Sequence, residues 1–276
     1  MKFSIITPVL NGLPALKAAA RSLALQNHKE REHIVQDGGS TDGTVEWLRT
    51  QSDLVWRSEK DGGMYDAINR GMTHASGDIL AWLNADEQYL PDALATVQAW
   101  FETHTETDAV FGDYIVARPD GTPLALRREI ALRRWYAVNG TLNVQSCTLF
   151  FRRSAWERVG PFDASYRIAG DKEWILRALD RGVRFAHLPA CLAVFCLAGS
   201  NLSYHPQRPA ESERIRVRFG AFRNRALRLL PLALRRIEKV LRGGYGQRNV
   251  QFDFIDPQSL QRRTISAQLG GTWKGP

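Results

Sequence analysis

The sequence predicts an α/β fold built on a mostly parallel sheet. Three observations point to it: apolar, β-branched runs of strand length, a helical spacing of apolar residues after each run, and a polar turn between the two. This alternation occurs four times within the first 100 residues. Strands that alternate with helices imply crossover connections and therefore parallel neighbours.

The four units follow one another along the chain. Strands are predicted at residues 3–9, 32–37, 53–58 and 78–83. The first is a continuous apolar run, as expected of a strand that is buried on both faces. Helices are predicted over residues 13–27, from about Asp42, over the segment that holds Met64, Ile68 and Met72, and from Pro91, a residue that suits the first position of a helix.

Composition and length limit the class of protein. The 276 residues are 44% hydrophobic and 24% charged, which allows one sizeable α/β domain with an appendage and excludes a disordered or collagen-like chain. The three cysteines are odd in number and lack a C-x-x-C spacing, so neither a disulfide framework nor a zinc site is expected, and a reducing compartment fits best. No segment has the pattern of a signal peptide or a membrane span, and we expect a cytoplasmic protein.

Acidic residues follow three of the predicted strands. Asp37 ends the second strand, within the stretch QDGGSTDGT at 36–44, Asp61 follows the third strand, and Asp86 follows the fourth. Gly, Asp and Ser also build ordinary turns and helix caps. Ligands of open parallel sheets, however, bind outside the carboxyl ends of the strands. We therefore expect the three carboxylates to converge in one pocket.

The type of ligand follows from what surrounds these acids. The fingerprints G-x-G-x-x-G and G-x-x-x-x-G-K-[ST] are both missing from the sequence. Clustered carboxylates repel a phosphorylated ligand unless a divalent cation lies between them, and oxygen ligands suit Mg²⁺ or Mn²⁺. The sequence thus predicts a metal ion that bridges the protein and a diphosphate.

Four linked motifs carry a resemblance to a known family. The stretches SIITPVLNG, QDGGSTDGT, EKDGGMYDAINRGM and GDILAWLNADEQYLP, followed by QSCTLFFRRSAWERVGPFDASYRIAGDKEWILRAL at 145–179, resemble the inverting, GT-A-fold glycosyltransferases of family 2, as in bacterial members that build exopolysaccharide or O-antigen. The similarity covers roughly the first 200 residues. It implies a Rossmann-like, mostly parallel sheet with helices on both faces. It also implies a nucleotide-sugar-binding half to about 117 and an acceptor half from 118 to 205.

The resemblance assigns donor-side roles to individual residues. Thr7 and Pro8 stand near where the family holds the nucleotide base, and Asp37 resembles the acid that binds the base or ribose. Asp61 is similar to the acid that contacts the nucleotide or donor sugar. The stretch NADE stands where the family has its D-x-D motif. There Asp86 is the expected metal ligand, Asn84 occupies the first acidic position, and Glu87 replaces a second Asp.

Asp171, in AGDKEW, matches the catalytic base of the family. Inversion by a single displacement requires a carboxylate that accepts the proton of the acceptor hydroxyl while a metal ion stabilises the departing diphosphate. An acid near the start of a helix is also favoured by capping and by the helix dipole alone. The order of the motifs favours the base. The implied partners are a nucleoside diphosphate sugar and a glycan or polyprenyl-diphosphate-linked acceptor.

Five further residues have a functional and a structural interpretation. Tyr65 either lines the donor pocket or packs, and Arg70 either pairs with phosphate or is a solvated helix-face arginine. Gln145 either touches the acceptor or simply ends a strand. Trp174 either stacks on an acceptor sugar or fills the core. His205 is either an additional metal or diphosphate contact or a solvated loop histidine.

A basic segment follows at 206–245, before a C-terminal tail at 246–276. From Arg208 to Arg248 there are 12 Lys and Arg against 3 Glu, a local charge of +9 within a chain of +8. An apolar stripe recurs at steps of three or four, on helices interrupted by Pro231: Ile215, Phe219, Phe222, Ala226, Leu230, Leu234, Ile237 and Leu241. The stripe predicts either contact with an anionic membrane surface through 211–242 or packing on the catalytic domain or a second subunit. The tail is expected to be partly disordered or to drape over the core.

The sequence also allows alternative functions. The pI of 9.7 allows a nucleic-acid-binding protein, but the aromatic residues of the basic segment lie on the apolar stripe rather than among the arginines. A sugar nucleotidyltransferase would need a glycine-rich basic loop after the first strand, and TPVLNGLPA has no basic residue. A metal-dependent inverting glycosyltransferase is the leading hypothesis, and a relative without catalytic activity is a further alternative.

Overall fold

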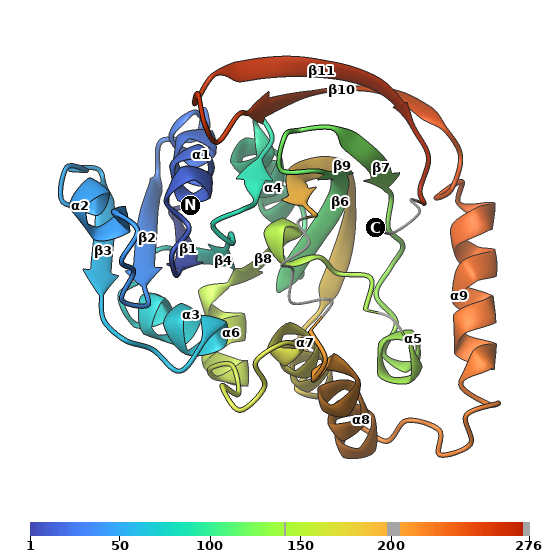
Figure 1. Cartoon of the computed structure of the whole chain (residues 1–276). Coiled ribbons are helices and arrows are strands. Elements are labelled where there is room, and N and C mark those ends of the chain that lie inside the picture. Colours follow the sequence, from blue (N-terminus) through green and yellow to red (C-terminus); the bar gives the residue numbers. More distant parts are fainter. Residues whose placement is uncertain (141, 198–204, 273–276) are drawn as a thin grey trace.

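A nine-stranded sheet forms the centre of the molecule (Figure 1). The computed structural model describes residues 1–140, 142–197 and 205–272. Within these ranges the strand order is β3-β2-β1-β4-β8-β6-β9-β5, and β7 pairs with β6. The strands are β1 (Phe3–Val9), β2 (Arg31–Asp37), β3 (Leu54–Ser58), β4 (Ile79–Trp82), β5 (Gln88–Tyr89), β6 (Ala109–Ala117), β7 (Pro123–Arg127), β8 (Leu149–Arg152) and β9 (Phe185–Cys196).

The N-terminal half of the sheet is entirely parallel. Strand β1 lies between β2 and β4, and β2 pairs with β3, all in the same direction. Val9 and Asp37 are register partners at the carboxyl ends of β1 and β2. The predicted α/β fold is confirmed, because the four predicted strands form this parallel unit and their carboxyl ends share one edge.

The second half of the sheet mixes directions. Strand β8 is antiparallel to both β4 and β6, β5 is antiparallel to β9, and β7 is antiparallel to β6. Only β6 and β9 run parallel there. Apart from β8, which overlaps the strand that the apolar run CTLFF at 147–151 predicts, the sequence patterns predict none of these strands individually.

Helices cover both faces of the sheet. The helices are α1 (Leu13–Ala24), α2 (Thr44–Leu48), α3 (Met64–Thr73), α4 (Ala93–Thr103), α5 (Arg134–Asn139), α6 (Arg153–Val159), α7 (Gly170–Asp180), α8 (Arg208–Arg218) and α9 (Leu229–Leu241), with a 3₁₀ turn at Ser146–Thr148. Alternate strand residues serve the two faces. Ile6 and Leu80 join the core beneath α3, α6 and α7, whereas Ile5 and Ala81 join the core beneath α1 and α4.

Two helix predictions need correction. Helix α4 begins at Ala93 with Asp92 as its N-cap residue, so Pro91 lies outside the helix instead of at its first position. Pro231 does not interrupt the basic segment either. It lies in the first turn of α9, where its missing N–H has no intrahelical partner to lose. The break falls between α8 and α9.

The C-terminal tail is an ordered hairpin over most of its length. Strands β10 (Arg248–Ile255) and β11 (Arg262–Leu269) pair antiparallel and arch over the β7 side of the molecule (Figure 1). Phe252, Phe254 and Leu269 are buried against Ile115 and Val194 of the main sheet. Of the two expectations for the tail, draping over the core is therefore confirmed for these residues.

No helix within the described ranges combines the length and the apolar character needed to cross a membrane. None of the three cysteines is in a disulfide bond, and Cys147 and Cys196 are buried.

Candidate functional site

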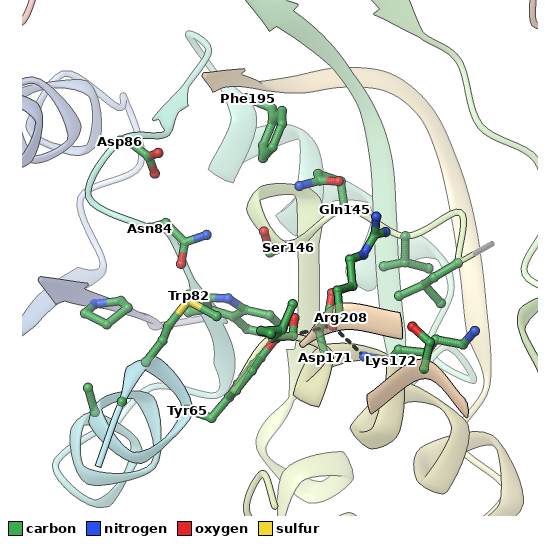
Figure 2. A pocket seen from close by; sticks show the side chains of 18 of the residues that line it. Tyr65, Trp82, Asn84, Asp86, Gln145, Ser146, Asp171, Lys172, Phe195 and Arg208 are labelled. Atoms are coloured by element: carbon green, nitrogen blue, oxygen red, sulfur yellow. Dashed lines mark hydrogen bonds between the residues drawn. The ribbon is translucent and has the colours of Figure 1, made fainter. Parts of the chain in front are cut away.

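A cavity of about 940 Å³ opens beyond the carboxyl ends of β1 and β4. Figure 2 shows Asn84 and Asp86 on one side of it, Lys172 and Arg208 on the other, and Asp171 between them. The polar residues that line the cavity come from both halves of the chain: Asp61, Tyr65, Asn84, Asp86, Asn139, Gln145, Ser146, Asp171, Lys172, Arg208, Ser212 and Arg216. Pro8 lines the same cavity at the end of β1.

The buried Glu87 side chain stabilises the NADE turn after β4. Glu87 is fully buried, and its carboxylate accepts hydrogen bonds from the Asn84 backbone N–H (2.9 Å) and the Ser146 hydroxyl (3.1 Å). Burial, reinforced by the neighbouring Asp86 carboxylate, raises the pKa of Glu87 to about 8. Glu87 therefore braces the turn rather than lining the cavity, while Asn84 and Asp86 line it.

Asn84 and Asp86 offer oxygen ligands to the cavity. The Asn84 Oδ1 atom is buried and has no hydrogen-bond partner among the described residues. Burial raises the pKa of Asp86, since the charged carboxylate lacks solvent. Within the described ranges, no three His, Cys, Asp or Glu side chains are grouped to hold a metal by themselves. Mg²⁺ is ordinarily held by one or two carboxylates completed by substrate phosphates, and this donor set fits such a site.

Asp61 lies where the turn after β3 comes close to the turn after β2. Its Oδ1 accepts a hydrogen bond from the Gly63 N–H (2.9 Å), and the residue lines the cavity. A Cβ atom at Gly38 would lie 2.7 Å from Asp61 Oδ2. A side chain at position 38 would thus displace Asp61, which explains the glycine that follows Asp37.

Asp37 is not among the residues that line this cavity. It is fully buried, and its Oδ2 accepts hydrogen bonds from the N–H groups of Gly39 and Ser40 (3.0 Å each) and from the Ser58 hydroxyl (2.6 Å), while its buried Oδ1 has no partner among the described residues. Of the three acids expected in one pocket, Asp61 and Asp86 therefore line this cavity and Asp37 does not, and the contact of Asp37 with the base or ribose stays a prediction. Backbone amides that must be satisfied at the end of β2 draw this carboxylate inward.

Two donor-side candidates also lie outside the cavity lining. Thr7 is fully buried, and its hydroxyl is 2.8 Å from His33 Nε2. Arg70 forms ion pairs with Asp66 (2.8 Å) and Glu59 (3.2 Å) at the edge of α3. The structure favours the structural interpretation of Arg70, because its guanidinium already has two acidic partners.

Trp174 and His205 are likewise not part of the cavity lining. Trp174 is fully buried, its Nε1–H donates to the Gly160 carbonyl (2.9 Å), and its ring lies 4.8 Å from the Phe151 ring. Its predicted stacking on an acceptor sugar is therefore wrong, and the core interpretation holds. His205 is exposed, and its Nδ1 accepts a hydrogen bond from the Gln207 N–H.

Asp171 stands at the start of α7 and faces the cavity. Its Oδ1 accepts hydrogen bonds from the Tyr65 hydroxyl (3.3 Å) and the Lys172 N–H (2.7 Å), and no described residue donates to its Oδ2. Burial raises the pKa of the carboxyl group. A Cβ atom at Gly170 would lie 2.7 Å from the Tyr65 ring, so the glycine before Asp171 lets the tyrosine reach it. Tyr65 therefore combines packing with a place in the site.

Residues from α7 and α8 that the sequence analysis did not identify complete the cavity. Lys172 is only 8% exposed, and its Nζ donates to the Gly140 carbonyl (2.9 Å). Arg208 and Arg216 line the same side. Lys172 had a sequence signal: its helical neighbours three and four positions away, Ala169, Ile175, Ile168 and Leu176, are all apolar, which is unusual for a solvated lysine.

Comparisons with known proteins identify relatives of this chain. The chain is 33% identical over 184 residues to the PGL/p-HBAD biosynthesis glycosyltransferase of Mycobacterium bovis, which covers 63% of this chain and 68% of the relative. It is 27% identical over 250 residues to the glycosyltransferase AglE of Haloferax volcanii, with coverages of 85% and 77%.

Solved structures share the fold. TarS 1–349 of S. aureus in complex with UDP-GlcNAc aligns with a TM-score of 0.64 at 19% identity, over 87% of this chain and 73% of that chain. The chain spans only 43% of the longer TarS structure. The mannosyltransferase PcManGT of Pyrobaculum calidifontis, in complex with GDP-Man and Mn²⁺, aligns with a TM-score of 0.59 at 19% identity, with coverages of 87% and 75%. The family model described as glycosyl transferase family 2 matches residues 4–159, and the chain belongs to that family.

Proposed function

We propose that this glycosyltransferase is metal-dependent and inverting, and that it moves one sugar from a nucleoside diphosphate sugar to a lipid-linked glycan acceptor in bacterial surface polysaccharide biosynthesis. The observation that carries the proposal is that the expected metal ligands and the expected base lie on different sides of one cavity. Oxygen atoms of the NADE turn lie on one side, and the half-buried carboxylate of Asp171, whose Oδ2 accepts no hydrogen bond from the described residues, lies toward the other.

The donor side of the cavity suits a nucleoside diphosphate sugar. Pro8, Asp61 and Tyr65 would contact the nucleotide and sugar, and Asn84 and Asp86 would hold Mn²⁺ or Mg²⁺ together with the diphosphate. When bound, the metal ion neutralises charge that develops on the departing diphosphate. Without a cation, Asp61 and Asp86 would repel the diphosphate.

Asp171 is the proposed general base. In a single displacement the acceptor oxygen bonds to the anomeric carbon as the bond from that carbon to the diphosphate oxygen breaks, and the hydroxyl proton passes to Asp171. Burial raises the pKa of this carboxyl group and so makes the carboxylate a stronger base. The Tyr65 hydroxyl and the Lys172 N–H both bond Oδ1 and fix its orientation, which leaves Oδ2 for the proton.

The donor assignment is tested by incubating the protein with a panel of UDP-, dTDP- and GDP-sugars, with Mn²⁺, with Mg²⁺ or with chelator. One donor is expected to raise the melting temperature and to release nucleoside diphosphate, in both cases only when the metal is present. Equal stabilisation by a donor in chelator would contradict metal dependence. The absence of any response across the panel would contradict the donor class.

We also propose that the protein associates peripherally with an anionic membrane through α9. The helix turns Arg235, Glu238 and Lys239 toward the body of the protein: Lys239 is fully buried with its Nζ 2.9 Å from Glu129, and Arg133 bonds Glu238 at 3.1 Å. Its outer face carries Leu229, Leu230, Leu234, Ile237, Val240 and Leu241, of which Leu241 is 82% exposed. In Figure 1 this helix stands at the right-hand edge of the molecule.

Charge selects the partner of this apolar face. Exposed arginines flank it, including Arg223, Arg225, Arg236 and Arg242. A second copy of the chain would bring a like-charged rim, whereas an anionic bilayer is complementary and accepts leucine side chains. The exposed large apolar side chains of α9 are all aliphatic, which gives nucleic-acid bases no aromatic stacking platform on this helix.

Vesicle sedimentation tests this surface. The wild-type protein is expected to sediment with phosphatidylglycerol vesicles and not with phosphatidylcholine vesicles. A triple variant, Leu234→Ser with Ile237→Ser and Leu241→Ser, is expected to stay in the supernatant. Val55→Ser, which removes an exposed apolar side chain on the edge strand β3, serves as the control and is expected to bind like wild type. Dimerisation that the triple variant abolishes, without vesicle binding by the wild type, would assign the face to a second copy.

A further inference from the structure

Lys172 is a buried cation whose Nζ is in ion-pair contact with no acidic side chain of the described residues. The residue is 8% exposed, and the contact of its Nζ is the neutral Gly140 carbonyl. No carboxylate in the described ranges forms an ion pair with it. Residues 141, 198–204 and 273–276, which lie outside the description, contain no Asp or Glu. Buried charges are ordinarily paired, because an unpaired one costs several kcal/mol.

Two arginines add to the positive charge around Lys172. Arg208 and Arg216 line the same cavity, and both depress the pKa of Lys172, although burial is the larger cause and the Asp171 carboxylate acts in the opposite direction. Arg216 pairs with Glu213 at 2.9 Å, a carboxylate that it shares with Arg228. A ligand that enters this side of the cavity therefore meets an excess of positive charge, at Lys172 above all.

The stereochemistry of the proposed reaction decides which substrate these cations face. In a displacement with inversion, the nucleophile and the leaving group lie on opposite sides of the anomeric carbon. The base must lie beside the nucleophile, and Lys172 directly follows Asp171. The cations beside the base would therefore be on the acceptor side, away from the departing diphosphate, whose metal ion Asn84 and Asp86 would hold.

We propose that Lys172, Arg208 and Arg216 form a subsite for an oxyanion of the acceptor, a phosphate or diphosphate group close to the hydroxyl that receives the sugar. The inference rests on the proposed function for its direction. Guanidinium and ammonium groups together suit phosphate oxygens. The same end of the cavity is lined by Leu142 and Leu232, and Leu232 belongs to α9. Phosphate and apolar contacts are thus adjacent, as a lipid-linked phosphate requires.

Inorganic phosphate is the probe for this subsite. Its dissociation constant is measured by calorimetry at constant ionic strength against chloride, in the absence and in the presence of saturating UDP or GDP. Phosphate is expected to bind equally well in both conditions. Lys172→Met and Arg216→Gln are each expected to weaken phosphate binding by at least about tenfold, as for the loss of a charged hydrogen bond. Lys29→Met, the same change at an exposed lysine, is the control and is expected to leave phosphate binding unchanged.

Two results would overturn the subsite. Phosphate binding that is lost when the nucleotide binds would place the anion in the donor site. Unchanged binding in both Lys172→Met and Arg216→Gln would remove the cations from the subsite. Failure of the donor panel would instead contradict the proposed function while the phosphate titration could still succeed, so the two outcomes are distinguishable.

Discussion

The cavity and the base of α9 differ in whether their buried charges form ion pairs. Beneath α9, Lys239 and Arg235 both pair with Glu129, at 2.9 and 3.4 Å. In the cavity, the only described contact of the Lys172 Nζ is a carbonyl, and no described residue donates a hydrogen bond to Oδ2 of Asp171. Paired charges attach a helix to the body of the protein. Charges without an ion-pair partner cost stability, and the proposed substrates would supply the missing partners.

The largest expected effect comes from Asp171→Asn, which tests the cavity side of this comparison. Because the amide cannot accept the proton, sugar transfer is expected to fall about 10²- to 10⁴-fold, the usual contribution of a general base. The donor dissociation constant and the melting temperature should change little, since the side chain keeps its shape. Unchanged transfer in a steady-state assay would show that Asp171 is not the base.

Lys239→Met tests the paired charges beneath α9. Removal of one partner from a buried ion pair commonly costs 3–5 kcal/mol, and the remaining contacts of Glu129 with Arg127 and Arg235 place the expected loss at the lower end, about 3 kcal/mol. Urea unfolding measures this change. Donor turnover per folded molecule is expected to remain at the wild-type level. A strong loss of turnover without a loss of stability would break the distinction between the two regions.

Asp86→Asn tests the oxygen ligands of the NADE turn. An amide is a weaker ligand for Mn²⁺ or Mg²⁺ than a carboxylate, so donor affinity in the presence of metal is expected to fall at least tenfold, about 1.4 kcal/mol. Donor affinity in chelator should stay the same or improve, because one repulsive charge is gone. Isothermal titration of donor with and without metal separates these effects. A loss of equal size in both conditions would contradict metal coordination by Asp86.

The smallest expected effect is the dependence of stability on pH at Lys172. Burial lowers its pKa to about 8, below the value of about 10.4 in the unfolded chain. The folded state therefore binds fewer protons between these values, and this residue destabilises the fold fully below pH 8 and progressively less up to pH 10.4. Lys172→Met is expected to raise the melting temperature most at pH 7 and hardly at pH 10. Thermal melts across this range, compared with Lys29→Met, would refute the burial penalty if the two variants behave alike.

The sequence patterns predict the parallel half of the sheet well. Each strand from β1 to β4 has a continuous apolar or β-branched run, and the polar turn after each run lies at its carboxyl end. Asp61, Asn84 and Asp86 are therefore found from motif order alone. Asp37 shows the limit of this reasoning, because the position of a carboxylate at a strand end does not reveal whether ligands or backbone amides will use it.

The C-terminal half was harder to predict for a physical reason. Periodicity identifies an apolar stripe on α9 but does not say which face of the helix turns inward. The charged face of α9 turns inward because it pairs with Glu129 and Arg133. These two residues lie about 100 residues away in the sequence. The cations of α7 and α8 were missed for the same reason, since their meeting in one cavity depends on tertiary packing. For Lys172 alone, the apolar residues three and four positions away in the sequence indicate that the side chain is buried.

The anomeric configuration of the product tests the central claim most directly, because the base, the acceptor subsite and the diphosphate site are assigned from a single displacement. Once the donor panel has identified a substrate, proton NMR of the newly formed linkage or of the hydrolysed sugar, recorded before mutarotation, gives the configuration. We predict the configuration opposite to that of the donor. Retention of the donor configuration would contradict both the role of Asp171 and the placement of Lys172 on the acceptor side.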